Sequence, residues 1–263
     1  MYRIEKITEK NKQQVIEFFR SDFIKHVFAL YDLQHDPLHT KMYAAFEDKQ
    51  LKGYILIYTA TDFPSVILEC ENNVAQSLTD YAPKTNFILH APQHLLPIIK
   101  TKFPKAKHYI ENWMLIKKNK ATVFKSSKVR KLRGLEDAKK LRMLLSTRKD
   151  RPSRNLEKYL DWISRMPIYG VFINNKLVSY AGSFLQLPQI WMIGGVYTHP
   201  NHRNKGYATL ATSAITQEAL NNADSASLFV GADNYPAIRV YEKIGYKKIG
   251  EKLWVDMETG LKP

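Results

Sequence analysis

The chain has 263 residues, of which 44% are hydrophobic, and it carries a formal net charge of +15. This length accommodates one large or two ordinary domains, and the hydrophobic share supports a buried core. No apolar run is long enough to cross a bilayer, and the N-terminus lacks the basic-then-apolar order of a signal peptide. We therefore expect a soluble, cytoplasmic protein that makes no membrane contact.

The single cysteine, Cys70, excludes an internal disulfide and fits a reducing compartment. It ends an apolar run that starts at Val66, so we expect a small core residue rather than a nucleophile. His35 and His39 have the helical spacing of a metal pair, but Pro37 separates them and no third ligand lies nearby. We therefore expect no metal site.

The positive charge is concentrated in the second half of the chain. Residues 121–263 contain 23 Lys or Arg against 12 Asp or Glu, and the densest stretch is 125–165. A solvated helix face, an anionic cofactor or substrate, and nucleic acid are three interpretations of such a stretch. Over 136–145 the cations alternate with leucines as in an amphipathic helix, and no nucleic-acid module accompanies them. We favour the helix face and do not expect nucleic acid as a partner.

The first half of the chain alternates strand and helix patterns. Thr8 and Asn11 can cap the first helix, and a loop containing Asp36-Pro37 follows it. The polar run at 117–120 is the expected boundary between two domains. The expected elements are strands at 2–7, 43–46, 51–59, 66–70, 86–90 and 109–116, and helices at 11–19, 73–82 and 93–103.

The second half repeats this order of elements. Leu51 and Tyr54 correspond to Leu177 and Tyr180 at a common offset, which favours a tandem repeat. We predict a mixed α/β fold in two domains, residues 1–120 and 121–263. The expected elements are strands at 129–132, 169–173, 177–187, from 190 up to Pro200 and 227–230, and helices at 136–146, from Asp150 or Ser153, and at 207–220.

The turn after Pro200 is built to hold phosphate. The run Arg203–Ala208 places a glycine and an alanine at a helix N-terminus, where no bulky side chain shields the backbone. The unpaired N–H groups and the dipole of a helix N-terminus favour an anion. Arg203 and Lys205 add positive charge beside them.

Two motifs give the chain a family resemblance. Residues 196–208 have the pattern Val-x-x-x-Pro-x-x-Arg-x-x-Gly-x-Ala, and residues 234–246 have the pattern Asn-x-x-Ala-x-x-x-Tyr-x-x-x-Gly-Tyr. The second half therefore resembles the GNAT superfamily of N-acyltransferases. The first half lacks both motifs, as in families that pair a degenerate GNAT-like domain with an active one. The resemblance implies two tandem GNAT-like domains, the N-terminal one degenerate.

The resemblance also implies that the strand before the phosphate turn splays from its neighbour and receives the pantetheine arm of coenzyme A. Gly194-Gly195 supplies a physical cause for the splay, because glycines in an apolar strand indicate a bulge or a close approach. The Val196 N–H would polarise the thioester carbonyl. The implied cofactor-binding residues are Val196, Tyr197, Thr198, Arg203, Asn204, Lys205, Gly206, Tyr207, Ala208, Thr209, Asn234 and Ala237.

By the same resemblance, Tyr241 is the catalytic acid that protonates the departing thiolate. A phenol suits this role because its ordinary pKa is about 10. Many relatives carry a Glu as the base on the central strand, but residues 169–198 contain no acid, and Ile190 and Met192 hold its positions. A water chain, His199, Asp233 or a group of the first domain remains for this role.

We predict an acetyl-CoA-dependent transfer of an acetyl group to a small-molecule primary amine, by direct attack in a ternary complex. The Arg/Lys-rich loop at 148–154 favours an anionic acceptor. Two alternatives remain: a non-catalytic acyl-CoA sensor, suggested by the missing carboxylate, and a nucleic-acid-associated protein, suggested by the basic stretch. The sequence leaves the oligomeric state open.

Overall fold

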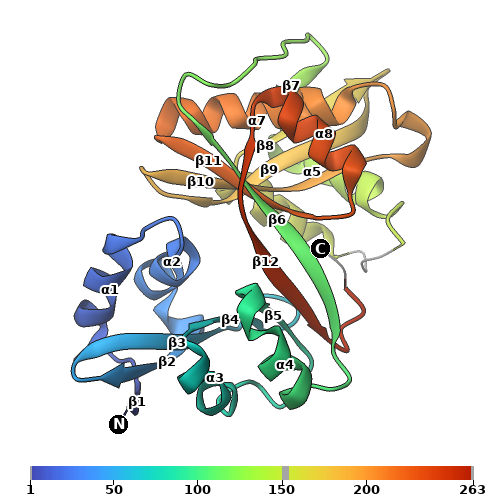
Figure 1. The fold of residues 1–263 in the computed structure, drawn as a ribbon. Coiled ribbons are helices and arrows are strands. Elements are labelled where there is room, and N and C mark those ends of the chain that lie inside the picture. The colour runs from blue at the N-terminus through green and yellow to red at the C-terminus, as the bar shows by residue number, and fades with distance from the viewer. Residues whose placement is uncertain (1, 150–153, 262–263) are drawn as a thin grey trace. The chain divides into compact units, whose positions relative to one another are not determined.

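A computed structural model describes residues 2–149 and 154–261. The chain forms two compact units: unit 1 runs up to Glu111 and resumes at Glu251, and unit 2 comprises Asn112–Gly250. Strands β6 (Lys107–Lys117) and β12 (Lys247–Met257) each begin in one unit and end in the other (Figure 1). Unit 1 therefore consists of two separate segments of the chain, whereas the sequence predicted one boundary, at residue 120.

Unit 1 is a mixed sheet with helices on both faces. Its strands are ordered β1-β2-β3-β4-β5-β12, and among those with a described register only the β4–β5 pair is parallel. One face packs on α1 and α2, and the other packs on α3 and α4. The elements are β1 (Arg3–Lys6), α1 (Lys12–Ser21), α2 (Val27–His35), β2 (Thr40–Glu47), β3 (Gln50–Tyr58), β4 (Ser65–Cys70), α3 (Asn72–Thr79), β5 (Phe87–Ala91) and α4 (Leu96–Lys102), with short 3-10 helices at Pro37–His39 and Gln93–Leu95.

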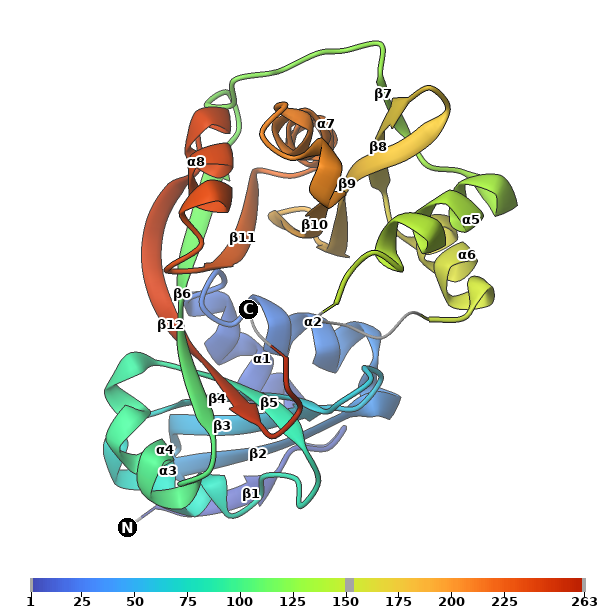
Figure 2. The same ribbon diagram turned by 90° about the vertical axis from the view of Figure 1, so that its right-hand side faces the viewer.

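Unit 2 has the same layout, with strand order β6-β11-β10-β9-β8-β7. Helix α7 packs on one face of β8 and β9, and α5 and α6 pack on the other face (Figure 2). Helix α8 shares the hydrophobic core of α7. The elements are β7 (Val129–Lys131), α5 (Gly134–Leu145), α6 (Leu156–Arg165), β8 (Ile168–Ile173), β9 (Lys176–Gln186), β10 (Ile190–Thr198), α7 (Tyr207–Asn222), β11 (Ser225–Gly231) and α8 (Tyr235–Ile244), with a short 3-10 helix at Pro200–His202.

The two units repeat one hairpin residue for residue. In β2–β3, Phe46 pairs with Leu51, and in β8–β9, Phe172 pairs with Leu177 at the same sequence offset. Both hairpins change register immediately beyond these pairs, so each has a bulge at the same place. Both turns consist of two residues with positive φ, as the two-residue primed hairpin turns require. The mixed fold of two tandem units predicted from the sequence is thereby confirmed.

Three elements differ from the sequence-based expectation. Helix α2 occupies a segment expected as a loop, because its side chains are apolar on several sides and His26 gives it no side-chain cap. Strand β12 was not expected at all, because the first half of this strand is charged and exposed. Helix α6 begins after Asn155, whose side chain accepts the Lys158 N–H at 3.1 Å. The expected caps Asp150 and Ser153 lie outside the described residues.

None of the described helices is long and apolar enough to span a lipid bilayer. Cys70 is buried in the core of unit 1, as expected from its apolar surroundings.

The end of β12 is a structural part of unit 1. Leu253 and Val255 are fully buried in the core that α3 and α4 cover. We predict that Leu253→Ala lowers the free energy of unfolding by about 2–5 kcal/mol in urea titrations, because a large buried side chain leaves a cavity. Ile249→Ala, on the same strand but 47% exposed, should change it by about 0.5 kcal/mol or less. Equal effects would contradict this assignment of the core.

Candidate active site

The candidate site of unit 2 starts where two parallel strands part. Ile190–Met192 of β10 pairs with Ser225–Ser227 of β11. Beyond this point β10 continues to Thr198 and β11 continues to Gly231, with no further pairing in the described register (Figure 2). Beyond Met192, the edge of β10 that faces β11 therefore makes no ladder with β11 in the described register.

Two glycines shape β10 just beyond the point of divergence. Gly195 has φ +67, in the left-handed region, and the register with β9 shifts between Gly194 and Tyr197. A Cβ on Gly194 would lie 2.7 Å from a ring carbon of Phe184, and one on Gly195 would lie 3.1 Å from the Tyr180 hydroxyl oxygen. The glycines thus serve both a bulge and the close approach of two aromatic rings, whose identity the sequence did not indicate.

The turn that follows β10 is tied by its own side chains. His199 Nδ1 accepts the Asn201 N–H at 3.2 Å, and a 3-10 turn covers Pro200–His202. The Arg203 Nε donates to the Thr198 carbonyl at 3.4 Å. These contacts carry the chain from the end of β10 to the start of α7.

The N-terminus of α7 presents backbone amides without side-chain cover. Asn204 and Gly206 are left-handed, with φ of +60 and +77, and nothing lies within 4 Å of where a Gly206 Cβ would be. The Leu210 N–H donates to the Gly206 carbonyl at 3.1 Å, so the amides of Tyr207–Thr209 precede the first intrahelical bond. The first turn contains no acidic residue, and Lys205 is exposed beside it. This arrangement favours an anion.

Tyr197 collects polar and cationic neighbours at the end of β10. Its hydroxyl is 2.9 Å from Thr147 Oγ1. The guanidinium carbons of Arg148 and Arg203 lie 5.3 and 6.0 Å from the centre of its ring, as in cation–π contacts. The expected cofactor residues Val196, Tyr197 and Thr198 are all half-buried on this stretch.

Tyr241 and Asn234 lie at opposite ends of α8. Burial raises the pKa of the Tyr241 hydroxyl well above its ordinary value, so this group stays protonated across the physiological range. Its ring meets Tyr246 edge to face at 6.1 Å. Asn234 caps the helix by accepting the Ala237 N–H at 3.4 Å, a structural task beside the one that the resemblance implies.

The structure singles out no general base among the sequence candidates. The Nδ1 lone pair of His199 already accepts a backbone N–H. Asp233 is exposed in the turn before α8. Strands β8, β9 and β10 contain no Asp or Glu. Met192 holds one of the two positions at which the family resemblance implies a Glu acting as the base, and its side chain is fully buried.

Part of the basic stretch at 125–165 is neutralised within unit 2. Arg130 makes two hydrogen bonds to Asp137, at 2.6 and 2.7 Å, and Lys131 pairs with Glu218 at 2.6 Å. The Arg130 guanidinium lowers the pKa of Asp137. On α5, Lys139 and Arg142 are exposed whereas the three leucines in the second half of the helix are buried, as expected for a solvated helix face. The central residues of the loop at 148–154, numbered 150–153, lie outside the described residues.

Unit 1 has a charged residue, Glu69, at the position that corresponds to Tyr197 of unit 2. With the hairpins aligned, Glu69 of β4 lies opposite Tyr54 as Tyr197 of β10 lies opposite Tyr180. The β3–β4 register runs without a shift, so β4 has no bulge like that of β10. The bulge therefore distinguishes β10 from β4, whereas the short parallel pairing does not, because β4 pairs with β5 over only three residues, Ser65–Ile67.

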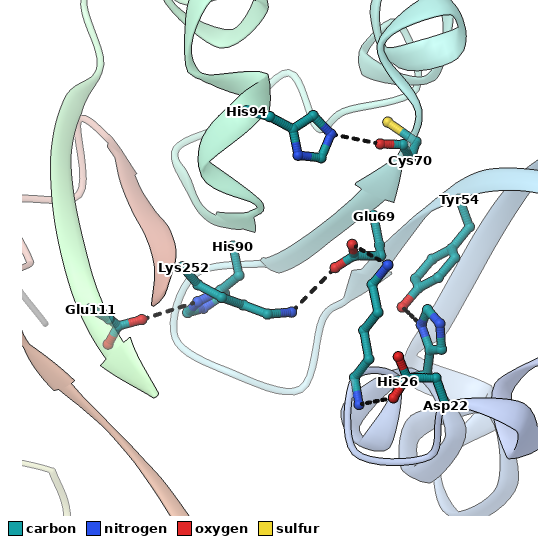
Figure 3. Close-up of polar contacts among 10 residues, drawn as sticks. Asp22, His26, Tyr54, Glu69, Cys70, His90, His94, Glu111 and Lys252 are labelled. Carbon is teal, nitrogen blue, oxygen red and sulfur yellow. Dashed lines mark hydrogen bonds and ion pairs between the residues drawn. The ribbon is translucent and has the colours of Figure 1, made fainter. Parts of the chain in front are cut away.

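In unit 1, Glu69 is surrounded by other polar and charged side chains of the chain itself (Figure 3). Glu69 is 5% exposed and pairs with Lys25 at 2.9 Å and with Lys252 at 3.3 Å. Tyr54 Oη lies 2.9 Å from Nδ1 of the buried His26. Burial lowers the pKa of His26 to about 4, so its ring is neutral at pH 7. This part of unit 1 is therefore occupied by buried, paired polar side chains.

The comparisons with known proteins agree with this architecture. Residues 168–255 match the family model described as FR47-like protein. A Drosophila protein superimposes with a TM-score of 0.73 at 13% identity, covering 98% of this chain and 99% of that one. A tandem GNAT protein from the clavulanic acid biosynthesis pathway gives 0.62 at 10%, covering 98% and 99%. The chain has a tandem GNAT fold.

A third structure extends the comparison. A GCN5-related N-acetyltransferase from Sphaerobacter thermophilus superimposes on this GNAT fold with a TM-score of 0.63 at 11% identity, covering 100% of this chain and 98% of that one. No curated protein matches the chain by sequence. At these identities the likeness establishes the fold, and the chemistry has to be argued from the residues of unit 2.

The bulge at Gly195 offers a direct test of the site geometry. We predict that Gly195→Ala lowers the free energy of unfolding by about 1–2 kcal/mol in urea titrations, because L-residues pay this cost at positive φ. Gly250→Ala is the control, since its φ is ordinary and its Cβ would lie 4.0 Å from the nearest heavy atom. A neutral Gly195→Ala would mean that β10 does not need its bulge.

Proposed function

We propose that unit 2 transfers an acetyl group from acetyl-CoA to a primary amine in a ternary complex. The observation that carries the proposal is the uncovered N-terminus of α7, which follows the segment of β10 that no longer pairs with β11. The helix N-terminus favours a diphosphate, and the unpaired edge of β10 favours an extended arm with amide groups. An acyl-CoA thioester carries both groups, a diphosphate and an extended arm with amides.

The residues of the turn and of β10 would share the binding of acetyl-CoA. The amides of Arg203–Thr209 hold the pyrophosphate, and the free edge of Val196–Thr198 pairs with the pantetheine arm. Asn234 donates to an amide of the same arm, and the small side chain of Ala237 lets α8 approach it. The Arg203 and Lys205 side chains add long-range attraction for the anion.

The chemistry then follows from where charge develops. The amine nitrogen attacks the thioester carbon, and the Val196 N–H donates to the oxygen that becomes negative. When the carbon–sulfur bond breaks, Tyr241 gives its proton to the thiolate. The amine loses its proton to water, directly or through a neighbouring group. Direct attack is preferred to a covalent route because burial raises the pKa of Cys70, in unit 1, to about 12.

A charge at Gly206 tests the phosphate site. We predict that Gly206→Glu abolishes acetyl-CoA binding in isothermal titration calorimetry, because a carboxylate at the helix N-terminus repels the diphosphate. Gly206→Ala is the matched control: it bears the same left-handed φ and meets open space, but adds no charge. It should retain binding within about tenfold. Undiminished binding by the Glu variant would refute the phosphate site.

Removal of one hydroxyl tests the acid. We predict that Tyr241→Phe lowers kcat about a hundredfold with little change in acetyl-CoA affinity, measured as release of free CoA thiol with an amine panel. Tyr246→Phe is the control, because Tyr246 is also buried but bonds Thr216 at 2.8 Å. It should lower stability rather than kcat. An unchanged rate in the Tyr241 variant would exclude it as the acid, and a native protein that binds but never releases thiol would indicate a sensor.

A further inference from the structure

Two groups of lysines that are far apart in the sequence meet at one end of unit 2. The polar run at 117–120 follows β6 and passes beside the end of α8 (Figure 2). A Cβ on Gly245, the C-cap of α8, would lie 2.6 Å from the Lys120 carbonyl oxygen. Strands β6 and β12 are neighbours in the sheet, and β6 ends in the unit where β12 begins. The exposed lysines of these segments, which we call the lysine patch, are Lys117, Lys118, Lys120, Lys243 and Lys247.

Backbone hydrogen bonds hold the lysine patch in place. The Lys120 N–H donates to the Lys117 carbonyl at 3.2 Å, which closes a tight turn. The Lys118 N–H donates to the Asp224 carbonyl at 2.9 Å, and the Thr122 N–H donates to the carbonyl of the last residue of α8 at 2.8 Å. The backbone that carries these lysines is therefore already ordered, so that a ligand does not have to order it on binding.

The charge of the lysine patch is not neutralised by the chain. Within the described residues, none of its five ammonium groups forms an ion pair with an acid. By contrast, Arg130, Lys131 and Lys139 of β7 and α5 each pair with an acid. The lysines are also not needed to cap α8, because the N–H groups of Gly245 and Tyr246 already bond carbonyls of its last turn.

The side chains around the lysine patch favour phosphate groups over a protein or a lipid surface. Protein interfaces are depleted in lysine and anchored by aromatic side chains, and segments that lie in a membrane surface insert Trp, Phe or Leu. Over 117–125 and 243–249 no aromatic side chain is exposed, and the exposed large apolar ones are Val123 and Ile249. Ammonium groups with so little apolar surface match a phosphodiester backbone, whose negative charges are closely spaced.

We infer that the lysine patch binds the phosphate backbone of duplex nucleic acid without reading its sequence. The inference goes beyond acetyl transfer and uses none of the residues assigned to it. The expectation of no nucleic acid rested on the stretch 125–165, part of which is neutralised by acids of unit 2. The lysine patch lies outside that stretch, and only the fold brings its two parts together. Lysine suits this contact because it acts as a point charge toward phosphate.

The test is a titration of a fluorescently labelled random DNA duplex with the native full-length chain, followed by anisotropy at several KCl concentrations. We expect a Kd of about 1–100 µM at physiological salt. The slope of log K against log[KCl] should be about −4.5, because each of five neutralised phosphates contributes about −0.9. A variant with Lys118→Gln, Lys120→Gln and Lys247→Gln together should make this slope shallower by about 2.7.

The matched control removes the same net charge from α5 and α6, with Lys139→Gln, Arg142→Gln and Arg165→Gln together. It should keep the native slope, because two of these cations already pair with acids of their own helix. Poly-glutamate of equal total charge should bind at least about tenfold more weakly, because its charges are less dense than those of a duplex. Absence of duplex binding by the native chain, the native slope in the patch variant, the same change in both variants, or equal binding of poly-glutamate would each overturn the inference.

Discussion

A parallel strand pair that lasts only three residues sets the geometry of unit 2. Pairing of β10 with β11 ends at Met192. Continued pairing would satisfy the backbone of β10 internally, so the early divergence leaves N–H and C=O groups that need a partner. Gly195 adds a bulge to the diverging segment of β10, where its left-handed φ coincides with the register shift against β9. The helix start that follows is placed by the same turn.

The comparison between the units shows how one scaffold supports two outcomes. Both contain the same hairpin with the same bulge, and both place a tyrosine at the same position on the third strand. In unit 2 this tyrosine is Tyr180, whose ring contacts Gly195. In unit 1 it lies opposite Glu69, whose charge is compensated by two lysines. A buried carboxylate needs such partners, so unit 1 uses internal ion pairs where unit 2 offers free backbone.

Local sequence patterns predicted most of the fold but not its closure. The hairpins, the parallel strands and α7 follow from alternation, turn residues and caps, which are local signals. The position of β12 could not be predicted in this way, because Leu253 and Val255 pack on strands more than 150 residues away. For the site, the motif around Gly206 could be recognised in the sequence. The contact of Phe184 with Gly194 was not, since strand register decides which side chain lies over which glycine.

The interleaving of the units has a consequence for synthesis on the ribosome. The first segment of unit 1 emerges before unit 2, yet two fully buried side chains of unit 1 belong to the end of β12, which is translated after unit 2. Its sheet edge at β5 must wait, unpaired, until residues 253–257 of β12 have been translated. An open edge of this kind is prone to pair with other chains. Unit 1 therefore cannot complete its core before unit 2 has been translated, whereas unit 2 is one continuous segment whose residues are released together.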